Sequence, residues 1–158
     1  MILTEPDLVR WGRLVGSTVA TPVFLALRGE LGAGKSVLAR AVARGAGVEG
    51  AVPSPTFNLV FRYRTPGGTE VVHLDLYRLE SPDELWELGW EELGAGDEIV
   101  LVEWPERAGD HLPADRWEIE LERAPGGSGV REVRVRKVGG PPHLPGFPIA
   151  LSGGGRGR

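Results

Sequence analysis

Apolar and polar positions along this chain follow two spacings, one typical of buried strands and one typical of helices. Residues 22–27 form a short apolar run that suits a buried strand. After a glycine-rich stretch, apolar positions recur at helical spacing: Val37, Leu38, Ala41 and Val42. The pattern predicts a helix that starts at Ser36 and ends near Gly45 or Gly47, where a left-handed C-cap costs little.

A further helix is predicted close to the N-terminus. Thr4 suits the N-cap position, Pro6 falls in the first turn, and Asp7 occupies the third helical position, as in a capping box. The apolar stripe of this helix consists of Leu8, Trp11, Leu14 and Val15. We therefore expect the helix to cover one face of a sheet.

Two segments in the middle of the chain alternate in the manner of strands. Residues 58–64 are separated by turn residues from residues 70–77. The second segment places Val72, Leu74 and Leu76 on one face and Val71, His73, Asp75 and Tyr77 on the other. We expect His73 to be a partly buried imidazole with its hydrogen bonds satisfied. A carboxylate on that face is not a core pattern, so Asp75 is a candidate functional residue.

The second half of the chain predicts one helix and three strands. A capping box at residues 81–84 predicts a helix from Pro82 to about Leu88, with Leu85, Trp86 and Leu88 packed inward. Residues 99–102 are apolar and Glu103 follows them, as in a buried parallel strand that delivers an acid at its carboxyl end. Residues 116–123 and 130–138 predict an antiparallel hairpin with one face in water.

Composition restricts the class of protein. The 158 residues suffice for one domain, which we assign to residues 1–138. Residues 139–158 hold seven Gly and four Pro and predict a flexible tail, either disordered or loosely docked on the domain. Cysteine is absent, which excludes disulfides and fits a cytoplasmic location. No apolar run reaches the length of a signal peptide core or a membrane span. The net charge is −4 with the signs interspersed, so direct nucleic-acid binding is not favoured.

The glycine-rich stretch at residues 29–36, GELGAGKS, matches the phosphate-binding pattern GxxxxGK(S/T). In this pattern backbone N–H groups and the start of a helix surround phosphate oxygens, a lysine reaches the β- and γ-phosphates, and a hydroxyl ligates Mg²⁺. The expected nucleotide-binding residues are Gly29, Leu31, Gly32, Ala33, Gly34, Lys35 and Ser36. The chain has 16 Arg and only two Lys, yet position 35 is Lys, whose compact ammonium fits inside such a loop. The predicted fold class is therefore a three-layer α/β, P-loop NTPase-like domain with a mixed parallel and antiparallel sheet.

Further residues are candidates for the chemistry of this site. Glu103 fits the Walker B position, where a carboxylate at a strand end acts with Mg²⁺. Asp75 is placed to orient the metal or the attacking water. The proline-containing loop at residues 54–57 either senses the γ-phosphate and Mg²⁺ or only turns the chain. Thr4, or a residue beside it, is either a helix cap alone or a contact to the nucleotide base.

Four stretches in order resemble the TsaE (YjeE) family of bacterial P-loop ATPases: GELGAGKS, SPTFNLV, HLDLYRL and LVEWPER. The resemblance spans roughly residues 4 to 138. It implies an ATPase that acts with the TsaB and TsaD proteins, in which ATP hydrolysis supports threonylcarbamoyl transfer to the adenosine beside the tRNA anticodon. It implies that tRNA is contacted only through the complex.

The same resemblance implies roles for individual residues. Phosphate binding falls on residues 32–36, Mg²⁺ binding on Ser36 and Glu103, catalysis or nucleotide sensing on Thr56 and Asp75, and shaping of the site on Trp104. The sequence departs from the family pattern only where Ser36 replaces the commoner Thr and Glu30 the commoner Asp. Neither change removes a functional group, and the tail lies outside the resemblance.

Two other functions remain open from the residues. A small-molecule kinase uses the same loop and Mg²⁺, and Arg62, Arg64 and Arg78 are candidates for the lid that it needs. A nucleotide-gated binding module would bind ATP and scarcely hydrolyse it. Turnover with and without partner proteins and small acceptors distinguishes the three.

Overall fold

A computed structural model of the chain describes residues 1–52, 59–125 and 129–147. Its elements, in order, are β1 (Ile2–Leu3), α1 (Glu5–Thr18), β2 (Val23–Arg28), α2 (Lys35–Ala46), β3 (Val60–Arg64), β4 (Glu70–Asp75), the 3₁₀ helices η1 (Pro82–Leu88) and η2 (Trp90–Glu92), β5 (Glu98–Glu103), the 3₁₀ helix η3 (Pro105–His111), β6 (Arg116–Arg123) and β7 (Arg131–Val138). Strands and helices follow the predicted order. The two-residue strand β1 and the 3₁₀ helices η2 and η3 were not predicted.

A seven-stranded mixed sheet runs through the molecule in the order β1-β7-β6-β2-β5-β4-β3. Its four central strands β6, β2, β5 and β4 are parallel, whereas β1, β7 and β3 pair antiparallel to their neighbours. In the register, Glu103 of β5 pairs with Leu27 of β2 on one side and with Asp75 of β4 on the other. The carboxyl ends of β2, β4 and β5 therefore meet at one edge of the sheet.

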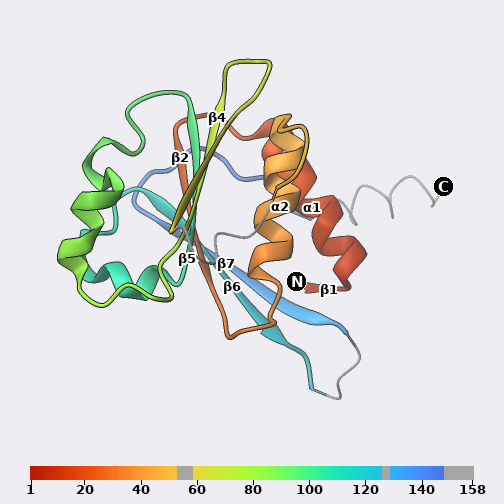
Figure 1. Cartoon of the computed structure of the whole chain (residues 1–158). Coiled ribbons are helices and arrows are strands. Elements are labelled where there is room, and N and C mark those ends of the chain that lie inside the picture. Colours follow the sequence, from red (N-terminus) through yellow and green to blue (C-terminus); the bar gives the residue numbers. More distant parts are fainter. Residues whose placement is uncertain (53–58, 126–128, 148–158) are drawn as a thin grey trace.

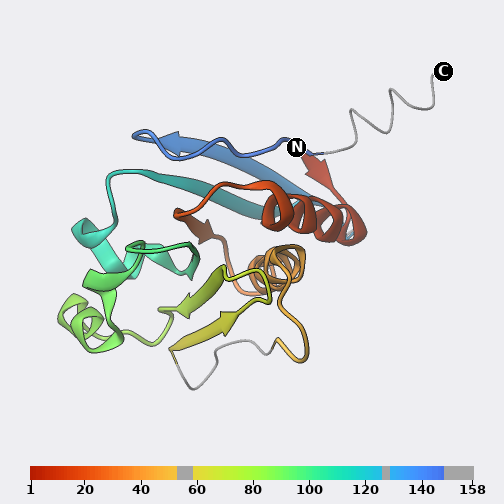
Figure 2. The same cartoon turned by 90° about the horizontal axis from the view of Figure 1, so that it is seen from above.

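Helical segments cover both faces of this sheet and make three layers (Figure 1). The long helices α1 and α2 lie on one face, and the green and teal segment that contains η1, η2 and η3 lies on the other (Figures 1 and 2). Each interlayer space holds its own cluster of buried apolar residues. The predicted three-layer α/β architecture with a mixed sheet is confirmed.

The second helical layer differs from the sequence prediction in its geometry. The capping box at Ser81 and Glu84 is present, but the segment that follows is a 3₁₀ helix. Leu85 is fully buried, whereas Trp86 remains 46% exposed, so its predicted packing was wrong. With three residues per turn, Leu85 and Leu88 lie on one side of the helix and Trp86 points away from it.

Helices α1 and α2 pack unusually close together, and glycine makes this possible. Gly12 and Gly16 of α1 are buried, and a Cβ atom on Gly16 would collide with the backbone of Val42 in α2. The predicted Thr4 capping box starts α1, and Gly47 in a left-handed conformation ends α2, as predicted. This close contact holds α2, and with it the glycine-rich loop, against the sheet.

Part of the predicted tail belongs to the folded core. Leu144 and Phe147 are buried in the cluster on the α1 side of the sheet. The indole N–H of Trp11 donates to Pro145 O at 3.0 Å, and that of Trp117 donates to Pro142 O at 2.7 Å. Of the two states expected for the tail, residues 139–147 therefore adopt the docked one; residues 148–158 lie outside the described part of the chain.

None of the described helices is long and apolar enough to cross a membrane.

Candidate functional site

The glycine-rich loop joins the carboxyl end of β2 to the amino end of α2. Gly29, Gly32 and Gly34 have φ values of 149°, 81° and 112°, which residues other than glycine rarely adopt. Gly34 is the N-cap of α2 and has no side chain to satisfy the first N–H groups of the helix. These N–H groups, at the positive end of the helix dipole, are therefore available to an anion.

Two arginines from the β6–β7 hairpin hold this loop from outside. Arg123 Nε donates to Gly32 O at 3.2 Å, and Arg131 Nε donates to Ala33 O at 2.9 Å. A Cβ atom on Gly32 would collide with the Arg123 guanidinium. Because both arginines bind carbonyl oxygens, they fix the peptide planes of the loop and with them the directions of its N–H groups. The sequence analysis did not single out either residue.

Lys35 lies inside the loop and is only 4% exposed. Its ammonium donates to Gly29 O, and to Glu30 O at 2.9 Å, and lies 4.4 Å from the centre of the Trp104 ring. Burial lowers the pKa of Lys35, and the nearby carboxylates of Glu103 and Asp75 oppose that shift. A cation is thus held in the phosphate loop by backbone oxygens and an aromatic face.

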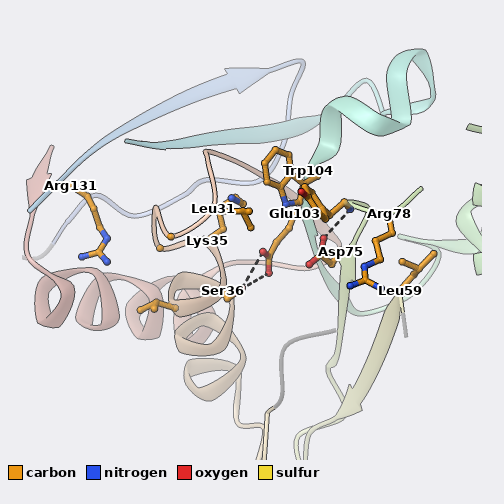
Figure 3. Close-up of a pocket in the computed structure, with 13 residues that line it drawn as sticks. Leu31, Lys35, Ser36, Leu59, Asp75, Arg78, Glu103, Trp104 and Arg131 are labelled. Carbon is orange, nitrogen blue, oxygen red and sulfur yellow. Dashed lines mark hydrogen bonds between the residues drawn. The ribbon is translucent and has the colours of Figure 1, made fainter. Parts of the chain in front are cut away.

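Glu103 ends strand β5 beside this lysine and is also almost fully buried. The Ser36 hydroxyl lies 3.2 Å from both of its carboxylate oxygens (Figure 3). The imidazole Nε2 of His73 lies 2.6 Å from Glu103 Oε2. His73 is 1% exposed, so it is a buried imidazole with a partner, as predicted, and its partner is the carboxylate of Glu103.

Asp75 stands at the end of β4, next to Glu103 in the strand register. Its Oδ1 accepts a hydrogen bond of 3.0 Å from the backbone N–H of Tyr77. Burial raises the pKa of the Asp75 carboxyl and Glu103 raises it further, whereas the bond from Tyr77 lowers it. A carboxyl with a raised pKa at the mouth of a phosphate site is suited to orient or accept a proton from water.

Trp104 turns the chain out of β5 with φ 58° and ψ 50°, a left-handed conformation that is uncommon outside glycine. Its ring lies 5.0 Å from that of Tyr77, at an interplanar angle of 48°. The Arg107 guanidinium lies 6.0 Å from the centre of the Tyr77 ring. This aromatic pair forms one wall above Lys35.

These groups line a pocket of about 410 Å³. Its lining includes seven residues that the sequence analysis proposed, namely Leu31, Gly32, Gly34, Lys35, Ser36, Asp75 and Glu103, together with the proposed site-shaping residue Trp104 (Figure 3). The proposed residues Gly29 and Ala33 do not line this pocket, and their carbonyl oxygens accept hydrogen bonds from Lys35 and Arg131. Thr56 lies outside the described residues. Thr4 does not line this pocket, and its hydroxyl caps α1 by accepting from Asp7 N.

Sequence reasoning missed four other lining residues, which are Val37, Leu59, Tyr77 and Arg131, and it considered Arg78 only for the lid of a kinase. Tyr77 and Arg78 closely follow Asp75, itself a candidate functional residue, so their position in the chain was a usable signal. Arg131 reaches the pocket from the far end of the sheet, and no local pattern indicated that.

The contact between His73 and Glu103 leads to a testable expectation. Replacing His73 with phenylalanine removes the bond that orients the Glu103 carboxylate. The factor by which Mg²⁺ raises nucleotide affinity should therefore be about tenfold smaller than in the wild type. Nucleotide affinity without Mg²⁺ should be unchanged. His73→Gln, which keeps a donor, should recover most of the effect, and the exposed His143→Phe is the control. Calorimetric titration of a non-hydrolysable nucleotide measures all four proteins, and an unaltered Mg²⁺ dependence in His73→Phe would contradict the expectation.

Comparison with known proteins places these features in a family. The family model described as "Threonylcarbamoyl adenosine biosynthesis protein TsaE" matches residues 3–133. A Treponema pallidum protein named tRNA threonylcarbamoyladenosine biosynthesis protein TsaE is 33% identical over 129 residues, which is 82% of this chain and 93% of that protein. A Streptomyces coelicolor protein of the same name is 37% identical over 132 residues, covering 81% and 88% of the two chains.

Structural comparison agrees on the fold. The crystal structure of YdiB from Bacillus subtilis superimposes with a TM-score of 0.70 at 23% identity, and covers 99% of this chain and 95% of that one. The family match covers far more than half of the chain and includes the phosphate loop, the β4 carboxylate and the β5 carboxylate. The chain therefore belongs to the TsaE family of threonylcarbamoyl adenosine biosynthesis proteins.

Proposed function

We propose that this protein binds ATP with Mg²⁺ and hydrolyses it in the synthesis of tRNA threonylcarbamoyladenosine, acting with the TsaB and TsaD proteins. The observation that carries the proposal is the convergence of Ser36 and Glu103 beside Lys35 at the mouth of the phosphate loop. A hydroxyl, a carboxylate and an ammonium at these positions are the groups that P-loop hydrolases use.

The donor atoms fit magnesium. Ser36 and Glu103 offer hard oxygen ligands, which Mg²⁺ prefers over nitrogen or sulfur. Among the described residues, no group of three or more His, Cys, Asp or Glu side chains is arranged to hold a metal. That suits an ion bound by one or two protein oxygens, water and nucleotide phosphates, rather than by a protein cage. When bound, such an ion neutralises charge that develops on the phosphates.

The residues of the chain divide the remaining work. Lys35 exchanges Gly29 O and Glu30 O for the β- and γ-phosphates, while the N–H groups of the loop and of α2 bind phosphate oxygens. Asp75 orients the attacking water from the end of β4. His73 holds Glu103 in position from beneath.

Three further assignments belong to the same proposal. Thr56 senses the γ-phosphate, Trp104 shapes the pocket above Lys35, and Thr4 or a neighbour contacts the base. The protein works in the cytoplasm, where ATP and tRNA meet, and it reaches tRNA only through its partners. The proximity of the Trp104 ring to Lys35 supports the second assignment.

The proposal predicts partner-dependent turnover. The TsaB–TsaD pair should raise steady-state ATP hydrolysis at least about tenfold, because loops such as the Trp104 turn reach catalytic geometry only when a partner packs against them. The isolated chain, with net charge −4, should bind tRNA weakly at physiological salt. Hydrolysis with and without the pair, and tRNA binding by each component, measure both effects. Rapid unaided turnover with phosphorylation of a small hydroxyl compound would instead assign a kinase.

A further inference from the structure

A second hollow lies on the face of the sheet opposite α1 and α2. It has a volume of about 610 Å³ and is bordered by η1, η2, η3 and the segment after β7. The aromatic and proline side chains that line it include Phe24, Trp86, Trp90, His111, Pro113 and Pro141. We call it the aromatic groove. It lies at the amino end of β2, whereas the nucleotide pocket lies beyond the carboxyl end of that strand, and the two share no lining residue.

Trp86 is the exposed tryptophan of this groove. Its side chain is 46% exposed, and its ring meets His111 edge-on, with 5.3 Å between the ring centres. The neighbouring Trp90 is buried and donates through its indole N–H to His111 O at 3.0 Å. A firmly held floor with one open tryptophan beside a hollow is the arrangement of a binding anchor rather than of a core.

The charge around the groove selects the kind of partner. Residues 79–115 contain twelve acidic side chains and only one basic one, whereas the rest of the chain contains ten acidic and seventeen basic ones. The expectation of interspersed signs was therefore wrong for this layer. Glu91 and Asp115 line the groove and are exposed, and in the described part of the chain Glu91 forms no ion pair. Such a rim repels RNA and attracts a basic protein surface.

The walls of the groove are joined directly to the catalytic strands. Helix η3 begins two residues after Glu103, and η1 follows the chain that leaves Asp75. Arg107 of η3 donates to Leu79 O at 3.2 Å, which links the segment that follows β5 to the segment that follows β4. Its guanidinium also lies against the Tyr77 ring, which contacts Trp104 above Lys35. A partner that presses on η1 and η3 therefore acts on segments that carry the nucleotide pocket.

We propose that the aromatic groove docks a segment of the TsaB–TsaD pair that presents an apolar side chain flanked by arginine or lysine. The apolar side chain enters beside Trp86, and the basic residues meet Glu91 and Asp115. Docking fixes η1 and η3 and, through Arg107, the Tyr77–Trp104 wall. The inference rests on the proposed function, since it identifies where the proposed partners bind.

The test measures binding of the full-length protein to the purified TsaB–TsaD pair. Trp86→Ala should weaken binding about 30-fold, the loss typical of a central tryptophan anchor. Glu91→Lys should weaken it by slowing association, and added salt should reduce the difference from the wild type. Glu49→Lys makes the same charge change on an exposed residue after α2 and should leave binding unchanged. Unaided ATP hydrolysis should be equal in all four proteins, because none of these residues lines the nucleotide pocket.

The possible results distinguish a failure of the proposed docking site from a failure of the proposed function. If the wild type binds the pair and Trp86→Ala binds as tightly, the groove assignment is overturned and the function stands. If the wild type fails to bind the pair at all, both are overturned. A wild-type dimer that Trp86→Ala dissociates would show that a second copy of this chain occupies the groove, which also overturns the proposal.

Discussion

Replacing Lys35 with alanine is expected to weaken ATP binding about a hundredfold while the protein stays folded. In the free protein the ammonium is already desolvated and held among Gly29 O, Glu30 O and the Trp104 ring. It therefore needs little rearrangement to meet the β- and γ-phosphates. Removing one member of such a buried charge pair costs about 3 kcal/mol of binding free energy, or about a hundredfold in affinity.

The chain supplies a matched control for this experiment. Lys137, its other lysine, lies exposed on β7, so Lys137→Ala removes the same charge away from the pocket. Gly29 and Glu30 retain access to water, which can satisfy their carbonyl oxygens in Lys35→Ala, so the melting temperature should change little. Calorimetry with ATP and thermal unfolding test both statements. Wild-type affinity in folded Lys35→Ala would remove the phosphate assignment.

Local sequence patterns predicted the parts of the site that local chemistry determines. The phosphate loop, the start of α2 and the acid at the end of β5 each depend on neighbouring residues, and each was found where its pattern placed it. The contact between His73 and Glu103 could not be predicted, because it depends on β4 lying beside β5. The register pairs Asp75 with Glu103, so His73, two residues earlier, lies diagonally across on the same face.

The arginines that hold the loop were missed for a similar reason. Arg123 and Arg131 lie about ninety to a hundred residues from their carbonyl partners along the sequence. They reach the loop only because β6 runs parallel to β2 and extends past its end. Hairpin alternation predicts the two strands, but it does not say which other strand they join.

Composition alone could not decide between a disordered and a docked segment at the end of the chain. Residues 139–147 are rich in Gly and Pro, which favours disorder when nothing else is known. The indole N–H groups of Trp11 and Trp117, however, find their acceptors on the proline carbonyls of this segment. Buried donors need partners, and a loop without regular structure supplied them. Such a requirement is visible only once the neighbouring faces are assembled.

The second large effect is expected when Glu103, at the carboxyl end of β5, is replaced with glutamine. Glu103→Gln preserves the shape of the side chain and its capacity to bond Ser36 and His73, but removes the negative charge that we propose binds Mg²⁺. Hydrolysis at saturating ATP should fall at least about a hundredfold, the scale reported by removal of one electrostatic contributor from a hydrolytic site. Nucleotide affinity without Mg²⁺ should stay within about threefold, because the loop and Lys35 are intact.

The control for this charge lies three residues further along. Glu106 is exposed in η3, forms an ion pair of 3.7 Å with Arg28, and its charge raises the pKa of Lys35. Glu106→Gln therefore removes a negative charge near the site without touching the proposed metal position. Steady-state hydrolysis and nucleotide titration, each with and without Mg²⁺, then separate binding from chemistry. If Glu103→Gln hydrolyses ATP with Mg²⁺ as fast as Glu106→Gln does, Glu103 is a buried strand-end charge held by His73. In that case Asp75, its neighbour in the register, is the remaining carboxylate of the pocket lining that can serve the metal.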